Sequence, residues 1–264
     1  MKSIETEIQD LGDDGSIAII YLSNAETRNS MTLDMGMAFH GEVNRLAGME
    51  TPPRALVISG KNDVFSSGGD FELLKSFAEN TPAQNREFME SFYRLFLAVR
   101  DMPFPVIAAV NGHAVGAALA LALACDIRYF TPDGKYALNF VRIGIHPGMG
   151  SSFLLREVAG LHNAQELLLT GKVIKGEDAY RRGMCHALYS KSEILEEGLK
   201  TAREIAACAP LAVRLLKQGM YRDMNLKDTL VYEAESQARN YATEDFREAM
   251  QAIGEKRRPV FKDK

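Results

Sequence analysis

The chain has 264 residues, of which 46% are hydrophobic and 25% are charged. This length is enough for one large domain with a full core, with or without a helical appendage. The formal net charge of −4 argues against nucleic acid or an anionic membrane as the main partner. Three widely spaced cysteines without a CxxC pair predict neither a disulfide framework nor a zinc site, and hence a reducing compartment. Because the first ten residues lack the apolar run of a signal peptide, we expect a cytoplasmic protein.

The first two thirds of the chain alternate between β-type runs and helical spacing. We expect strands at 16–22, 55–60, 104–110 and 126–131. We expect helices at 32–47, after the glycine-rich turn at 142–153, at 161–171 and at 176–183. Thr32 is placed to cap the first of these helices, and glycines close the last two. The alternation predicts an α/β fold.

Residues 102–125 carry no Asp, Glu, Lys or Arg and could pass for a membrane span. Pro103, Pro105 and the pair Asn111-Gly112 interrupt the segment, whereas a spanning helix needs ~20 continuous apolar residues. We therefore predict a short strand, a turn and a short helix in the core, and no membrane partner.

From about residue 191 the strand signals stop. Four segments then show helical spacing of their apolar residues, at 192–209, 211–222, 226–242 and 245–257. Short helices in series cannot bury their apolar faces alone, so they must pack on the first part or on another subunit. We predict a core at 1–190 and a helical oligomerisation region at 191–264.

Two glycine-rich turns are the most informative feature of the sequence. FSSGGDF (65–71) and VNGHAVGAALALALACDIR (110–128) each read as a strand that turns directly into a helix. Each turn leaves backbone N–H groups without a partner inside its helix. Two such turns can hold one oxyanion, as an enolate or a tetrahedral intermediate requires.

Gly68 and Gly69 also have a simpler interpretation, because glycine at a turn most often serves a positive φ angle. Their place between a β-type run and a helix that begins near Asp70, together with the second turn, favours the oxyanion interpretation. Asp70 itself fits a helix cap better than a catalytic acid, since its carboxylate suits the free N–H groups there.

Five segments in order resemble the crotonase superfamily, also called the enoyl-CoA hydratase and isomerase family. ETRNSM (26–31) lies where the family has its K-A-L-N-A-L segment, and FSSGGD and VNGHAVGAA follow. The sequences IGIHPGMG (143–150) and RRPVFK (257–262) complete the pattern. Each segment alone is a weak signal, but their order along nearly the whole chain is specific.

The resemblance implies a crotonase-like spiral of ββα repeats, with a C-terminal helical trimerisation region that forms homotrimers or dimers of trimers. It also implies an acyl-CoA thioester as the ligand, with no cofactor because coenzyme A is part of the substrate. By position, the N–H groups of Gly69 and Ala117 correspond to the oxyanion hole. The residues implied to contact substrate are Arg28, Ser66, Ser67, Gly68, Asp70, Phe71, Phe261 and Lys262.

The expected catalytic acids are missing from this chain. Hydration of a conjugated thioester needs one group to activate water and another to protonate the α-carbon, and family hydratases use two glutamates. By alignment with the glycine turns, these positions hold Ala120 and Phe140, neither of which can transfer a proton. Ala120 lies one helical turn past Ala117, so we expect its methyl group to leave apolar space near the oxyanion hole.

His146 is the remaining candidate for proton transfer, because residues 139–150 contain no Asp or Glu. An ordinary histidine pKa near ~6.5 suits this role, although a histidine packed or hydrogen-bonded in a loop is the more common case. His113 is a weaker candidate. Ser66, Ser67, Ser151 and Ser152 lack the G-x-S-x-G context of a serine hydrolase, and Gly148-Met149-Gly150 is too short for a dinucleotide fingerprint.

Basic residues should meet the phosphates of coenzyme A despite the acidic chain. Arg28 and the tail at 261–262 are candidates, while Lys256, Arg257 and Arg258 fit a solvated C-terminus equally well.

We expect an enoyl-CoA hydratase or isomerase family member. Two alternatives remain, namely another acyl-CoA reaction that uses His146 (isomerisation, hydrolysis or decarboxylation) and a non-catalytic acyl-CoA-binding subunit.

Overall fold

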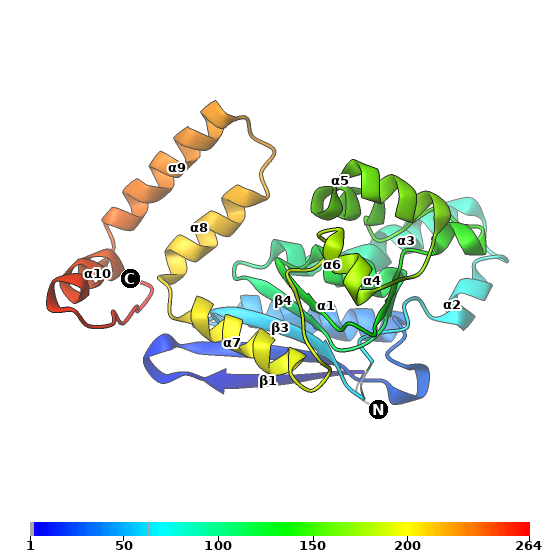
Figure 1. Cartoon of the computed structure of the whole chain (residues 1–264), viewed down its shortest axis with the longest axis horizontal. Coiled ribbons are helices and arrows are strands. Elements are labelled where there is room, and N and C mark those ends of the chain that lie inside the picture. Colours follow the sequence, from blue (N-terminus) through cyan, green and yellow to red (C-terminus); the bar gives the residue numbers. More distant parts are fainter. Residues whose placement is uncertain (1–2, 63) are drawn as a thin grey trace.

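A computed structural model describes residues 3–62 and 64–264 (Figure 1). Its centre is a six-stranded sheet in which β1 pairs antiparallel with β2 and all other neighbours are parallel. In spatial order its strands are β1 (Ile4–Asp10), β2 (Ser16–Leu22), β3 (Ala55–Gly60), β4 (Val106–Val110), β6 (Ile127–Phe130) and β9 (Ala187–Leu188). A second, smaller sheet contains β5 (Ala114–Val115), β7 (Lys135–Ala137) and β8 (Ile174–Lys175).

Ten α-helices lie within the described ranges, together with short 3-10 turns. They are α1 (Leu33–Ala47), α2 (Phe71–Ser76), α3 (Pro82–Leu97), α4 (Ala117–Ala124), α5 (Ser151–Thr170), α6 (Gly176–Arg181), α7 (Ile194–Ala206), α8 (Pro210–Met220), α9 (Leu226–Tyr241) and α10 (Glu244–Glu255). The α/β expectation is confirmed. The Thr32 cap is confirmed too, because its Oγ1 accepts a hydrogen bond from Met35 N at 3.1 Å.

Helices cover both faces of the large sheet, and the side-chain alternation of its strands explains why. In β2, Ile20 and Leu22 belong to the core that includes residues of α1, α3, α4 and α5. Ile17 and Ile19 point to the other face, where they share a second core with α7. A strand that is buried on both faces has a continuous apolar sequence, as parallel strands usually do.

The segment considered as a membrane span is divided as expected. Residues 102–125 form β4, a turn, the short strand β5 and α4, all around the main core. Within the described part of the chain, no helix combines the length and the apolar character needed to cross a bilayer.

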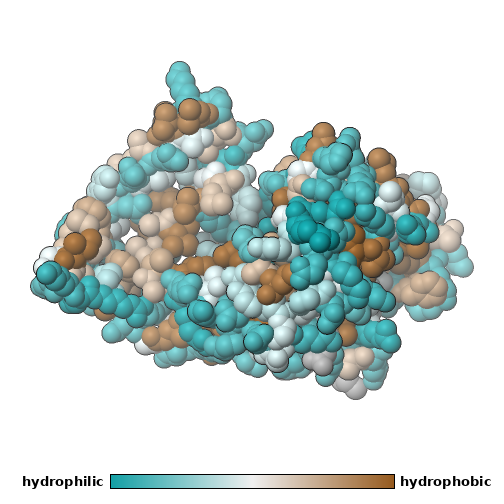
Figure 2. All heavy atoms as spheres, in the orientation of Figure 1, coloured by the Kyte–Doolittle hydropathy of each residue, from teal (hydrophilic) through white to brown (hydrophobic). Residues whose placement is uncertain are grey.

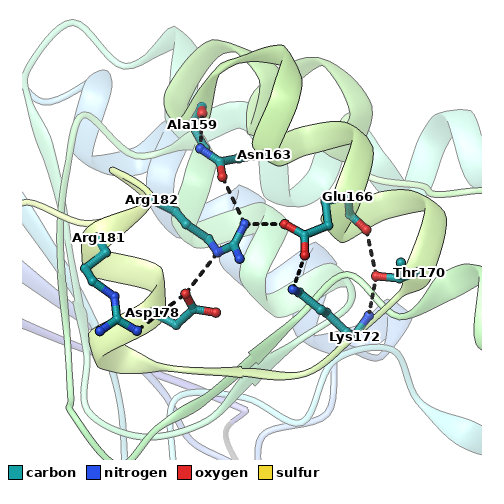
Figure 3. A network of polar contacts seen from close by, with 8 residues as sticks. All are labelled: Ala159, Asn163, Glu166, Thr170, Lys172, Asp178, Arg181 and Arg182. Carbon is teal, nitrogen blue, oxygen red and sulfur yellow. Dashed lines mark hydrogen bonds and ion pairs between the residues drawn. The ribbon is translucent and has the colours of Figure 1, made fainter.

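The helix expected after the turn at 142–153 and the helix expected at 161–171 form one helix, α5, which starts at Ser151 and kinks at Gly160, where φ is +77°. A polar network joins its second half to α6 (Figure 3). Arg182 donates to Glu166 at 2.6 Å and to Asp178 at 3.1 Å, and Lys172 also pairs with Glu166. Lys172 and Arg182 together lower the pKa of Glu166 to about 2.

The last three helices form an arm that extends away from the sheet (Figure 1). A buried polar cluster anchors its first helix, α8, to the core. Lys217 Nζ donates to Asp126 Oδ2 at 2.8 Å and to the Phe104 carbonyl at 2.9 Å, while Tyr221 Oη donates to Asp126 Oδ1 at 2.7 Å. By contrast α7 packs on the sheet, so a division of the chain at residue 191 stays a prediction.

Candidate active site

The two glycine turns lie side by side at one edge of the large sheet. β3 and β4 run parallel in register, from Leu56 opposite Val106 to Ile58 opposite Ala108, so both strands end at the same edge. Beyond the strands, Ser66 N donates to the His113 carbonyl at 3.2 Å. A methyl group added at Gly68 would lie 2.2 Å from the Val115 carbonyl oxygen, so only glycine permits this approach.

Gly69 and Ala117 both line one cavity of about 180 Å³. Ala117 is the first residue of α4, and its N-cap Gly116 adopts φ +57°. Among the described residues, neither the Gly69 N–H nor the Ala117 N–H has a hydrogen-bond acceptor. The start of a helix favours a negative charge at this place.

The structure separates the roles of the two adjacent glycines. Gly68 has φ +94°, so the conformational interpretation applies to it. Gly69 has no positive φ, and a methyl group there would meet nothing closer than Leu74 Cδ1 at 3.8 Å. Neither backbone strain nor crowding therefore requires glycine at position 69, which fits a position whose N–H must stay accessible to a ligand.

Hydrogen bonds hold the first turn in place. Buried Ser66 donates its hydroxyl to the Asn29 carbonyl at 2.6 Å and accepts from Gly68 N at 3.1 Å. Ser67 lines the cavity, but its hydroxyl donates to the Thr27 carbonyl at 3.1 Å. Ser66 thus acts on the shape of the turn, whereas Ser67 lines the cavity.

Asp70 lines the cavity and serves as the cap of α2. Its Oδ1 accepts from Leu73 N at 3.0 Å, and its Oδ2 accepts from the Ser30 hydroxyl at 3.2 Å. The predicted capping role is confirmed. A carboxylate held by two donors in this way is poorly placed to act as a base.

Most of the cavity wall is apolar. The side chains come from α2, α3 and the segment after β7, and include Leu73, Leu74, Phe77, Met89, Phe92 and Phe140. The polar side chains on the wall are Ser67, Asp70, Tyr93, Asn139 and His146. The arrangement suits an apolar group that carries a carbonyl at the glycine turns.

Both positions where glutamates were expected are apolar, with different surroundings. Phe140 lines the cavity, and its ring approaches Gly116 beside the start of α4. Ala120 is fully buried in the main core and does not line the cavity. The expectation of open apolar space at Ala120 was wrong, because neighbouring core side chains close that part of the fold.

His146 lines the cavity and is exposed to solvent. Its Nδ1 lies 2.9 Å from the Pro147 carbonyl oxygen, which favours the tautomer that carries the proton on Nδ1. Nε2 is then the atom free to accept a proton. His113 lies outside the cavity lining, and its Nδ1 accepts from Lys135 N at 3.0 Å. Burial, with a smaller effect of Lys135, lowers the pKa of His113.

Six predicted contact residues do not line the cavity, namely Ser66 and Gly68 of the first turn and the four described next. Arg28 is exposed beside the first turn, where its carbonyl accepts from Ser67 N at 3.0 Å. Phe71 is 67% exposed and lies under the Lys75 ammonium group. Phe261 and Lys262 lie near the start of β3, where Arg54 donates to the Phe261 carbonyl at 2.8 Å. Because the cavity lies beyond the other end of β3, the tail does not reach it within one chain.

Tyr93 and Asn139 line the cavity and had no predicted role. Tyr93 comes from α3 and follows Phe92, so in the sequence it resembles one more aromatic residue of the core. Burial raises the pKa of Tyr93, and the backbone N–H of Met149 opposes this more weakly. Only the packing of α3 against the segment after β7 identifies Tyr93 as a cavity residue.

Comparison with known proteins agrees with this geometry. Residues 12–264 match the family model described as enoyl-CoA hydratase/isomerase. A crotonyl-CoA hydratase of Syntrophomonas wolfei is 32% identical over 251 residues, covering 93% of this chain and 94% of that protein. A short-chain-enoyl-CoA hydratase of Clostridium acetobutylicum is 28% identical, covering 94% and 95% of the two chains.

A solved structure shows the same fold. The crystal structure of an enoyl-CoA hydratase from Bacillus anthracis superposes with a TM-score of 0.90 at 27% identity, over 100% of both chains. The crotonase-like fold expected from the sequence is thereby confirmed. The chain belongs to the enoyl-CoA hydratase/isomerase family, within the crotonase superfamily, and is an enzyme of that family.

Proposed function

We propose that the cavity binds an acyl-CoA thioester and that the N–H groups of Gly69 and Ala117 polarise its carbonyl oxygen. The proposal is supported by Gly69 and Ala117, which belong to two adjacent turns, line one cavity and have N–H groups without an acceptor in the described chain. Donors fixed at the place where negative charge develops stabilise an enolate, and the loss of one typically costs ~10²- to 10³-fold in rate.

The reaction differs from two-glutamate hydration, because Ala120 and Phe140 cannot exchange protons. Asp70 is held by two donors, which leaves His146 as the cavity side chain best suited to proton transfer at neutral pH. We therefore favour a reaction through a thioester enolate, such as isomerisation or decarboxylation, in which His146 moves the proton. Hydrolysis of the thioester is a further candidate, in which the same N–H groups would stabilise a tetrahedral oxyanion.

A non-catalytic acyl-CoA-binding subunit is the second candidate. The observation that favours it is the hydrogen bonding of His146, whose ring contacts a backbone carbonyl and no carboxylate within the described residues. A carboxylate partner is the usual means of orienting a catalytic imidazole and raising its basicity. The two candidates predict the same binding and different turnover.

Proton exchange separates them directly. Butyryl-CoA incubated with the protein in D₂O should exchange its α-protons, as followed by NMR, and His146→Ala should slow this exchange by at least ~10²-fold. His162→Ala is the matched control, because His162 is exposed on α5 and lies outside the cavity. Affinity for butyryl-CoA should stay within a few-fold in both variants.

Crotonyl-CoA hydration by the same samples should be slow. Each missing acid or base typically lowers a rate by ~10² or more. Binding without exchange, hydration or release of free coenzyme A would support the second candidate, whereas no binding of any acyl-CoA would overturn both. An ordinary hydratase kcat that survives His146→Ala would show that other groups transfer the protons.

We also propose that the chain forms homotrimers or dimers of trimers through its arm. Apolar side chains are exposed along α8, α9 and α10, and some of them are visible in Figure 2. They include Leu216, Met220, Leu226, Leu230, Val231 and Ile253. Contact between the tail at 261–262 and coenzyme A would need the ligand of another subunit, and it stays a prediction.

A further inference from the structure

Tyr93 places the only phenol hydroxyl in the cavity wall of the described chain. The residue lies on α3, and a methyl group added at Gly148 would lie 2.5 Å from its hydroxyl oxygen. Gly148 has no positive φ, so its backbone conformation does not require glycine. The missing side chain at position 148 makes room for the Tyr93 hydroxyl.

No protein group accepts a hydrogen bond from the Tyr93 hydroxyl within the described chain. A phenol hydroxyl can donate one hydrogen bond, so its proton is the group that needs an acceptor. No hydrogen bond within residues 3–62 and 64–264 involves the Tyr93 hydroxyl, and it is not among the buried polar atoms that lack a partner, so solvent reaches it. Buried tyrosine hydroxyls normally find a partner, and solvent can supply one only while the cavity is unfilled.

The described part of the cavity wall around Tyr93 offers its hydroxyl no polar partner. Neighbouring wall residues such as Leu73, Phe77, Met89 and Phe92 are apolar. A purely hydrocarbon acyl chain that displaces water from this wall would leave the hydroxyl without an acceptor. A donor left without an acceptor in this way typically weakens binding by ~10-fold or more, which works against such a ligand.

We propose that Tyr93 determines substrate specificity by donating a hydrogen bond to an oxygen atom on the acyl chain, away from the thioester. The preferred substrate class is then an acyl-CoA whose chain carries a ketone, hydroxyl or ether oxygen. This inference rests on the proposed function and narrows its substrate. Sites that hydrogen-bond a substrate group discriminate strongly against analogues that lack it.

Binding of matched ligands tests the proposal. We would measure dissociation constants by calorimetry for hexanoyl-CoA and for three relatives with a ketone on the third, fourth or fifth carbon of the chain. At least one ketone should bind wild-type protein ~10-fold or more tightly than hexanoyl-CoA does. In Tyr93→Phe this ratio should fall to within about twofold, because the ring remains and only the donor is lost.

Tyr180→Phe is the matched control, since Tyr180 is 49% exposed on α6 and does not line the cavity, and it should keep the wild-type ratio. Thermal unfolding of each variant checks that the fold is retained. The proposal is overturned if no ketone is preferred, or if the preference survives in Tyr93→Phe. If hexanoyl-CoA binds without any ketone preference, only the role of Tyr93 fails. If neither hexanoyl-CoA nor any ketone binds more tightly than free coenzyme A, the proposed function fails as well.

Discussion

Replacing Lys217 with methionine should destabilise the protein strongly, because it leaves a buried carboxylate without its cation. The side chains of Lys217 and Asp126 are 7% and 17% exposed, and their charged atoms lie 2.8 Å apart. Removing one partner of such a pair costs ~3–5 kcal/mol. Since Asp126 keeps hydrogen bonds from Tyr221 Oη and Val106 N, we expect about 3 kcal/mol, near the lower limit of that range. For a chain of this size that loss lowers Tm by ~6–12 °C.

Urea and thermal unfolding at one fixed protein concentration would measure the effect, since oligomerisation shifts apparent stability. Lys200→Met is the matched control, because Lys200 is 61% exposed and its pair with Glu197 spans 3.7 Å. Exposed pairs contribute ~0–1 kcal/mol. Adding Asp126→Asn to Lys217→Met should recover part of the loss. If Lys217→Met were no less stable than Lys200→Met, the buried pair would not anchor the arm.

Three other predictions concern the turn, the response to pH and the assembly. Gly68→Ala should cost more than ~2 kcal/mol in urea unfolding, because of its positive φ and the nearby carbonyl, whereas Gly41→Ala in open space on α1 should be neutral or stabilising. Burial raises the pKa of both Cys125 and Tyr136 to about 12, so the folded state holds protons that the unfolded state loses from about pH 9 upward. Stability should therefore fall between pH 9 and 12, by up to ~1.4 kcal/mol per pH unit for each group, and a Tm that stays constant over this range would contradict the cause. Sedimentation should show a trimer or hexamer that Leu230→Asp weakens, and a stable monomer at micromolar concentration would refute the proposed assembly.

Local signals in the sequence were enough to predict the elements around the glycine turns. Caps such as Thr32 and Asp70 depend on residues three positions away, and the structure confirms both. The order of the motifs identified the family, and hence the fold. The same signals predicted a helix after the turn at 142–153 and another at 161–171, which the structure joins into α5 with a kink at Gly160.

The cavity walls could not be predicted in the same way, since they depend on how distant segments pack. Ala120 follows Ala117 by one helical turn, yet the core closes around it. Tyr93 faces the cavity only because α3 packs beside Gly148, which is far away in the sequence. In the tail, helical spacing predicted helices correctly, but it did not distinguish α7, which covers the sheet, from the arm that follows.

The most direct test of the proposed oxyanion site compares butyryl-CoA with S-butyl-CoA, a thioether that lacks only the carbonyl oxygen. Two backbone hydrogen bonds, at ~0.5–1.5 kcal/mol each, predict that the thioester binds ~5- to 150-fold more tightly in calorimetry. Gly69→Pro, which deletes one of the two donors, should reduce this ratio in protein whose folding has been checked. Equal dissociation constants for the two ligands would show that the N–H groups of Gly69 and Ala117 do not bind the thioester oxygen.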